Sequence, residues 1–116
     1  MERRMTTVEV ELDVFSGMPN PAWTLSEEQA TEFLAKLAEL QETEPKSRFS
    51  GLGYRGLIIR TQQGLDRELH IQNGFLEVGG GFFLDQGRSL ERWLVGTGRK
   101  FVDKNVLEVV EADLEN

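Results

Sequence analysis

The chain has 116 residues, of which 39% are hydrophobic, and its 13 basic and 20 acidic side chains give a net charge of −7. The length predicts one domain over residues 1–116, and the acidic balance repels polyanions, which argues against nucleic acid as a partner. The sequence has no cysteine, no secretory signal pattern and no apolar run that could span a membrane, so disulfides are excluded and a cytoplasmic protein is expected.

Residues 7–14 alternate between apolar and polar side chains. The apolar positions are Val8, Val10, Leu12 and Val14, and the polar ones are mostly acidic. A period of two predicts a half-buried strand with its acidic face in solvent. Because this strand opens the chain, we expect it at the edge of the sheet, where its main chain could pair with a peptide or a second copy.

Residues 15–23 read Phe-Ser-Gly-Met-Pro-Asn-Pro-Ala-Trp. Pro19 and Pro21 fix their own φ angles and push the preceding residues toward extended geometry. The segment is therefore predicted to be a stiff, non-helical turn. Its Phe15, Met18 and Trp23 side chains suit either packing or recognition, and core packing is the favoured reading for Trp23.

A helix is predicted over residues 27–41. Ser26 and Gln29 form a capping box, and apolar residues then recur at helical spacing. Pro45 ends any continuation. The polar, glycine-containing residues 42–53 are predicted to form a loop.

Three further strands are predicted, over residues 54–61, 68–72 and 75–78, with a turn at residues 62–64. Asn73-Gly74 favours a hairpin between the last two, because both residues tolerate a positive φ. The alternative is one strand over residues 68–78 with a glycine bulge at Gly74.

The triple glycine at residues 79–81 is interpreted as a turn or bulge. A phosphate loop would need a following lysine and a helix, whereas Phe82 and Phe83 follow here.

Two more helices are expected, over residues 90–95 with Ser89 as cap and over residues 104–114 with Asp103 as cap. Residues 106–110 would also fit a strand. The fold class is therefore α+β, an antiparallel sheet of about four strands with two or three helices packed on one face.

No motif indicates a catalytic, metal or cofactor site. His70 is the only histidine, and the pattern around Asp13 and Asn20 matches no calcium loop. An enzyme would need Asp13, Ser16, His70 and a further carboxylate to converge. A binding module that uses a strand edge and loop aromatics is favoured instead. Its candidate peptide-binding residues are Phe15, Met18, Trp23, Phe49, Tyr54, Arg55 and Phe82.

Residues 13–23, together with Gly-Tyr-Arg-Gly-Leu at 53–57 and Leu-Glu-Arg-Trp-Leu at 90–94, resemble the small cysteine-free peptide-binding accessory proteins of crocagin biosynthesis, a ribosomal-peptide natural-product pathway. The resemblance implies a non-enzymatic homodimer that holds a precursor peptide for tailoring enzymes. The remaining alternative is a regulatory subunit that binds a folded partner.

Overall fold

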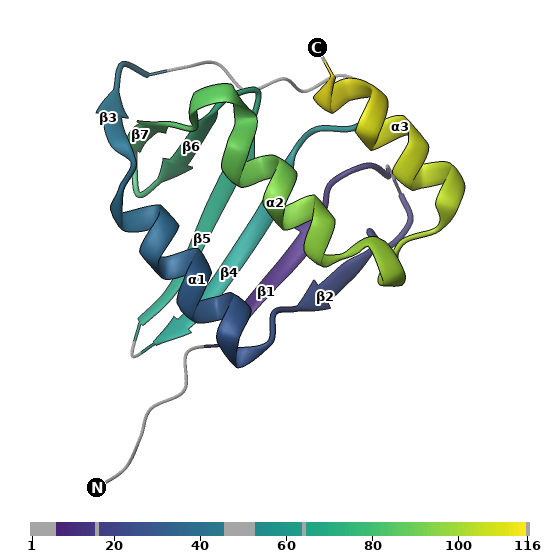
Figure 1. Ribbon diagram of the computed structural model, residues 1–116, viewed down its shortest axis with the longest axis horizontal. Coiled ribbons are helices and arrows are strands. Elements are labelled where there is room, and N and C mark those ends of the chain that lie inside the picture. Colours follow the sequence, from purple (N-terminus) through teal and green to yellow (C-terminus); the bar gives the residue numbers. More distant parts are fainter. Residues whose placement is uncertain (1–6, 16, 46–52, 64, 116) are drawn as a thin grey trace, which may run out of the picture.

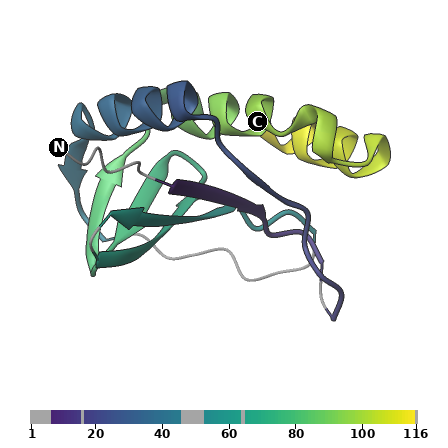
Figure 2. The same cartoon turned by 90° about the horizontal axis from the view of Figure 1, so that it is seen from below.

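A computed structural model describes residues 7–15, 17–45, 53–63 and 65–115 of the chain. The fold is α+β (Figure 1). Seven antiparallel strands form one sheet in the order β2-β1-β4-β5-β6-β7-β3, and the three α-helices all lie on one face of it (Figure 2). No helix in the described part of the chain is long and apolar enough to cross a membrane.

The sheet has more strands than the four expected. The strands are β1 (Thr7–Leu12), β2 (Ala22–Thr24), β3 (Gln41–Thr43), β4 (Leu57–Gln63), β5 (Leu65–Gln72), β6 (Phe75–Val78) and β7 (Gly81–Leu84). The sequence analysis missed β2, β3 and β7. Two of these have only three residues, and the third has four that directly follow two turn glycines, so none shows a readable alternation.

The expectation that β1 lies at the sheet edge is wrong. It pairs with β4 on one side and with β2 on the other. Two further hydrogen bonds extend the ladder between β1 and β2. The Leu12 N–H donates to the Pro21 carbonyl at 2.8 Å, and the Leu25 N–H donates to the Val8 carbonyl at 2.9 Å. The chain returns as β2 directly after the proline-rich turn, and that return covers the flank of β1.

The Asn73-Gly74 hairpin is confirmed. Asn73 and Gly74 have φ angles of 51° and 89°, as this two-residue turn requires, so the bulge alternative is excluded. The glycine turn is also confirmed, since Gly79 and Gly80 connect β6 to β7 with φ angles of 54° and 82°. The turn expected at residues 62–64 is wrong at its first two positions, because Gln62 and Gln63 belong to β4, and residue 64 lies outside the described residues.

The hydrophobic core lies between the helices and the helix-facing side of the sheet. Alternate residues of β1, β4, β5 and β6 point into it, and helical side chains meet them. Its fully buried residues include Val8, Val10, Leu12, Phe33, Leu57, Ile59, Ile71, Leu76, Leu94 and Val110. The helix α1 (Glu27–Ala38) begins at the predicted capping box and ends before residue 41, where the chain turns into β3.

The second and third predicted helices are present, but the cap predicted for the second is wrong. The helix α2 (Ser89–Thr97) follows a short 3-10 turn, η1 (Gln86–Arg88), and a second 3-10 turn, η2 (Arg99–Phe101), precedes α3 (Lys104–Leu114). Asp103 caps α3 as predicted, and the strand alternative for residues 106–110 is excluded. Ser89, however, is not the cap of α2.

The cap of α2 comes from the buried Asp85. Its carboxylate accepts hydrogen bonds from the Leu90 and Glu91 N–H groups at 2.8 and 3.0 Å. Arg88 precedes α2 in the left-handed conformation, with φ of 56°, so the chain reverses sharply between Asp85 and the helix. The cap of α2 is thus the carboxylate of Asp85, five residues before Leu90, in place of the Ser89 hydroxyl.

Candidate functional site

Among the described strands, β3 forms one border of the sheet and pairs with β7 alone. The Asp85 N–H donates to the Gly74 carbonyl at 2.7 Å, which sets the phase of the ladder between β6 and β7. Hydrogen-bonded and non-bonded pairs alternate in antiparallel ladders. Leu84 therefore turns its main chain toward Gln41, and Glu42 turns its own N–H and C=O away from β7.

The outer side of β3 is an exposed edge. In the described part of the chain, no strand pairs with it, and the Glu42 side chain lies in solvent. Outward main-chain groups on such an edge are a template for pairing with another extended chain. The other border of the sheet, β2, directly follows Pro21.

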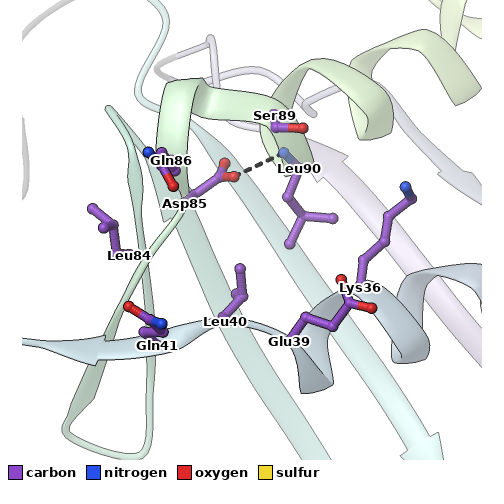
Figure 3. Close-up of a pocket in the computed structure, with 9 residues that line it drawn as sticks. All are labelled: Lys36, Glu39, Leu40, Gln41, Leu84, Asp85, Gln86, Ser89 and Leu90. Carbon is purple, nitrogen blue, oxygen red and sulfur yellow. Dashed lines mark hydrogen bonds between the residues drawn. The ribbon is translucent and has the colours of Figure 1, made fainter.

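A groove opens beside the first residue of β3, between the end of α1 and the start of α2 (Figure 3). Its cavity measures about 370 Å³, which lies within the size range of ligand pockets. The lining residues are Lys36, Glu39, Leu40, Gln41, Leu84, Asp85, Gln86, Ser89 and Leu90. Leucine side chains supply apolar surface, and amide, hydroxyl and carboxylate groups surround them.

The charged side chains that line this groove differ in whether another residue of the protein already binds them. Both carboxylate oxygens of Asp85 accept hydrogen bonds from α2. The Lys36 ammonium lies 3.5 Å from the Glu32 carboxylate and 5.4 Å from the centre of the Trp93 ring. Glu39 is exposed at the end of α1, and within the described ranges no cation pairs with it.

A second hollow of about 570 Å³ also borders β3. It is lined by Glu42, Arg67, Glu68, Val78, Gly79, Gly81 and Phe83. An extended chain that paired with β3 would therefore run past two hollows. These lining residues come from β3 and from three consecutive strands, β5, β6 and β7, with their connecting turn.

A buried polar cluster fastens the helices to one another and to the chain before β4. Arg88 donates two parallel hydrogen bonds to Glu91, at 3.0 and 2.9 Å, and further ones to the Asp113 carboxylate and carbonyl. Tyr54 donates its hydroxyl to Glu91. Glu91 has no exposed surface. Tyr54, Arg88 and Glu91 are buried and only Asp113 reaches solvent, so this cluster serves mainly to join α2, α3 and the chain before β4.

The surroundings of the cluster shift the pKa values of Tyr54 and Arg88. Burial first, and then the Glu91 carboxylate, raise the pKa of Tyr54 above its ordinary value. Hydrogen bonds to Glu91, and then to Asp113, raise the pKa of Arg88. Tyr54 thus stays a neutral donor, and Arg88 stays the cation that balances the buried carboxylate.

The proline-rich turn is held by polar contacts at its base. The Asn20 Oδ1 accepts from the Val14 and Phe15 N–H groups at 3.1 and 2.8 Å, and its Nδ2 donates to Glu11 at 2.8 Å. Arg55 donates to the Asp13 carboxylate at 2.8 Å. These contacts tie Asn20 and Arg55 to the end of β1 and the residues after it, while the Met18 side chain is exposed.

The open face of the sheet carries a charge network. The Arg60 guanidinium lies 2.7 Å from Glu11 and 3.2 Å from Glu68, and Glu9 is 3.6 Å away. Hydrogen bonds from Arg60, followed by that from Asn20, lower the pKa of Glu11. The acidic face that the sequence analysis expected to be merely solvated is therefore organised around one arginine.

The sequence-predicted peptide-binding residues do not meet in one place. Trp23 and Tyr54 are buried, as the core reading of Trp23 predicted, and Trp23 donates to the Thr97 hydroxyl at 2.9 Å. Met18 is 59% exposed in the proline-rich turn, next to partly buried Phe15 and Arg55. The remaining two are Phe82, near the other sheet border, and Phe49, which lies outside the described residues.

The residues of the enzyme alternative are only partly brought together. Asp13 binds the Arg55 side chain, and the His70 Nε2 lies 3.0 Å from the Arg55 carbonyl. A carbonyl only accepts, so this Nε2 carries a proton, and His70 is 6% exposed. Ser16 lies outside the described residues. Over the described ranges, no group of three or more His, Asp or Glu residues is placed to hold a metal ion.

Sequence reasoning missed the residues that form the β3 edge and its groove. Glu42 lies in a short polar stretch that reads as a loop, and the groove brings residues 36–41 beside residues 84–90. One local sequence feature marks the groove: the aliphatic residue Leu84 directly precedes Asp85, the acidic residue that caps α2. Strand order makes β3 an edge, and register turns the main chain of Glu42 outward.

Comparison of the chain with protein-family models, curated proteins and solved structures gave no match. The resemblance to crocagin accessory proteins and the homodimer therefore stay predictions.

Proposed function

We propose that the protein binds an extended peptide, which pairs with the outer side of β3 and adds one strand to the sheet. The observation that carries this proposal is the outward-facing main chain of Glu42 beside a groove of about 370 Å³. Main-chain hydrogen bonds supply affinity in this mode of recognition, and nearby hollows select side chains.

The peptide would be held without chemical change. The Glu91 carboxylate and the Tyr54 hydroxyl are buried against each other, and the His70 Nε2 lies within hydrogen-bond distance of the Arg55 carbonyl. These features support a holding role over catalysis. If the resemblance to crocagin accessory proteins holds, the ligand is a precursor peptide presented to tailoring enzymes.

The test begins with selection of random dodecapeptides displayed on phage against the full chain, followed by calorimetry with the strongest peptide. The informative variant is Glu42→Pro. Proline removes the outward N–H but no bond to β7, and it is tolerated on edge strands. The matched control is Glu42→Gln, which keeps the N–H and the shape of the side chain.

We expect Glu42→Pro to weaken binding at least about tenfold, and Glu42→Gln to weaken it less than about threefold. Circular dichroism and urea unfolding of both variants check that the fold is intact. Failure to enrich any peptide, or equal binding by a folded Glu42→Pro variant, would contradict strand addition at β3.

A further inference from the structure

We infer that the groove beside Gln41 receives a long cationic side chain, Arg or Lys, from the peptide. This inference rests on the proposed function, since it assumes that a strand pairs with β3. It goes further by assigning the chemistry of the ligand at one position.

The first reason is distance. Neighbouring strands lie about 4.8 Å apart, and Gln41 stands between the outer side of β3 and the groove that it helps to line. A side chain from the added strand must therefore cross the width of β3 to enter. Short side chains such as Ala or Ser end before that point.

The second reason is the surface over which such a side chain would lie. Leu40 is half-buried and lines the groove, so it presents apolar surface there. Lys and Arg pack their methylene stems along apolar surface while the charged group stays among polar groups. Gln41, Gln86 and Ser89 supply oxygen acceptors around the leucines.

The third reason is charge. The positive end of α2 is already neutralised by Asp85, and Lys36 is engaged by Glu32 and Trp93. The groove also lies at the last turn of α1, which is the negative end of the helix dipole. The Glu39 carboxylate adds a further negative charge at the same place. An anionic side chain would meet this negative potential, whereas a cation is attracted by it.

The experiment uses the peptides selected on phage against the full chain. We expect every strong binder to contain Arg or Lys. In the strongest one, replacement of Arg by citrulline, which has the same shape without the charge, should weaken binding about fivefold. Replacement of a selected Lys by norleucine serves in the same way. Binding of the charged peptide should weaken in 0.5 M salt more than binding of its neutral analogue.

A variant of the protein locates the effect. Glu39→Gln should reduce the preference for the charged peptide to less than about twofold. Its matched control is Glu108→Gln, an exposed carboxylate on α3 that lies outside the groove, which should keep the full preference.

The outcomes separate this inference from the proposed function. If peptides bind through β3 but lack basic residues, or if citrulline costs nothing, the cationic groove is wrong and strand addition stands. The same holds if Glu39→Gln keeps the full preference. If no peptide is enriched at all, the proposed function fails, and the inference fails with it.

Discussion

Arg88 binds Glu91 through two parallel hydrogen bonds, from Nε to Oε1 at 3.0 Å and from Nη2 to Oε2 at 2.9 Å. Glu91 has no exposed surface, so its charge is balanced entirely from within the protein. The same guanidinium reaches Asp113 near the end of α3. Arg88, whose backbone has the left-handed conformation, thus joins the start of α2 to the end of α3.

Removal of this guanidinium is expected to destabilise the protein strongly. Arg88→Met leaves the Glu91 carboxylate buried without its cation, which costs about 3–5 kcal/mol of the free energy of unfolding. The control is Arg99→Met, since Arg99 pairs with Glu111 at the surface, and exposed pairs contribute at most about 1 kcal/mol. Urea unfolding measures both, and equal losses would show that the buried pair has no special weight.

The cap of α2 can be located by a second pair of variants. Asp85→Ala removes the acceptor of two helix N–H groups at a buried site and should cost about 2 kcal/mol. Ser89→Ala should change stability by less than about 0.5 kcal/mol, because Ser89 is exposed and does not cap the helix. Thermal or urea unfolding distinguishes them, and a larger loss for Ser89→Ala would restore the cap predicted from sequence.

Two glycines near the end of α2 should respond to alanine with opposite signs. A Cβ at Gly98 would lie 2.3 Å from atoms of the Trp23 indole, so Gly98→Ala should destabilise by about 1–3 kcal/mol. A Cβ at Gly96 meets nothing within 4 Å, so Gly96→Ala should stabilise the helix by up to about 1 kcal/mol. Urea unfolding followed by tryptophan fluorescence reports both, and a neutral Gly98→Ala would mean that Trp23 is not packed there.

The Glu11–Arg60 pair should make stability depend on pH. The pKa of Glu11 is lowered in the folded state from its ordinary 4.5, mainly by Arg60, so its stabilising contribution is complete above pH 4.5. This contribution is lost as the pH falls through the folded pKa. Glu11→Gln should be less stable than the wild type at pH 7, by at most about 1 kcal/mol. The difference should shrink below pH 4.5, and a difference that grows in acid would reverse the assignment.

Local sequence signals predicted the elements whose causes are local. The Ser26–Gln29 capping box, the Asn73-Gly74 turn and the alternation of β1 each lie within a few residues and were confirmed. The strands β2 and β3 were missed because three residues carry no period, and their pairing partners lie far away in the chain or across a turn.

The candidate site was unpredictable for the same reason. The edge position of β3 depends on the order of all seven strands, and the groove depends on where α1 ends relative to Asp85. Loop aromatics were expected to contribute to the binding surface, but Tyr54 is buried, with its hydroxyl donating to Glu91 of α2. Trp23 is buried as its favoured reading predicted, and it donates to Thr97 at the end of the same helix.

Amide hydrogen exchange at Glu42 tests strand addition most directly. The Gln41 and Thr43 N–H groups pair with β7, so they should be protected with or without peptide, whereas the Glu42 N–H faces outward. We expect its exchange, followed by NMR, to slow at least about tenfold when the selected peptide is bound. Unchanged exchange at Glu42 under saturating peptide would contradict the account.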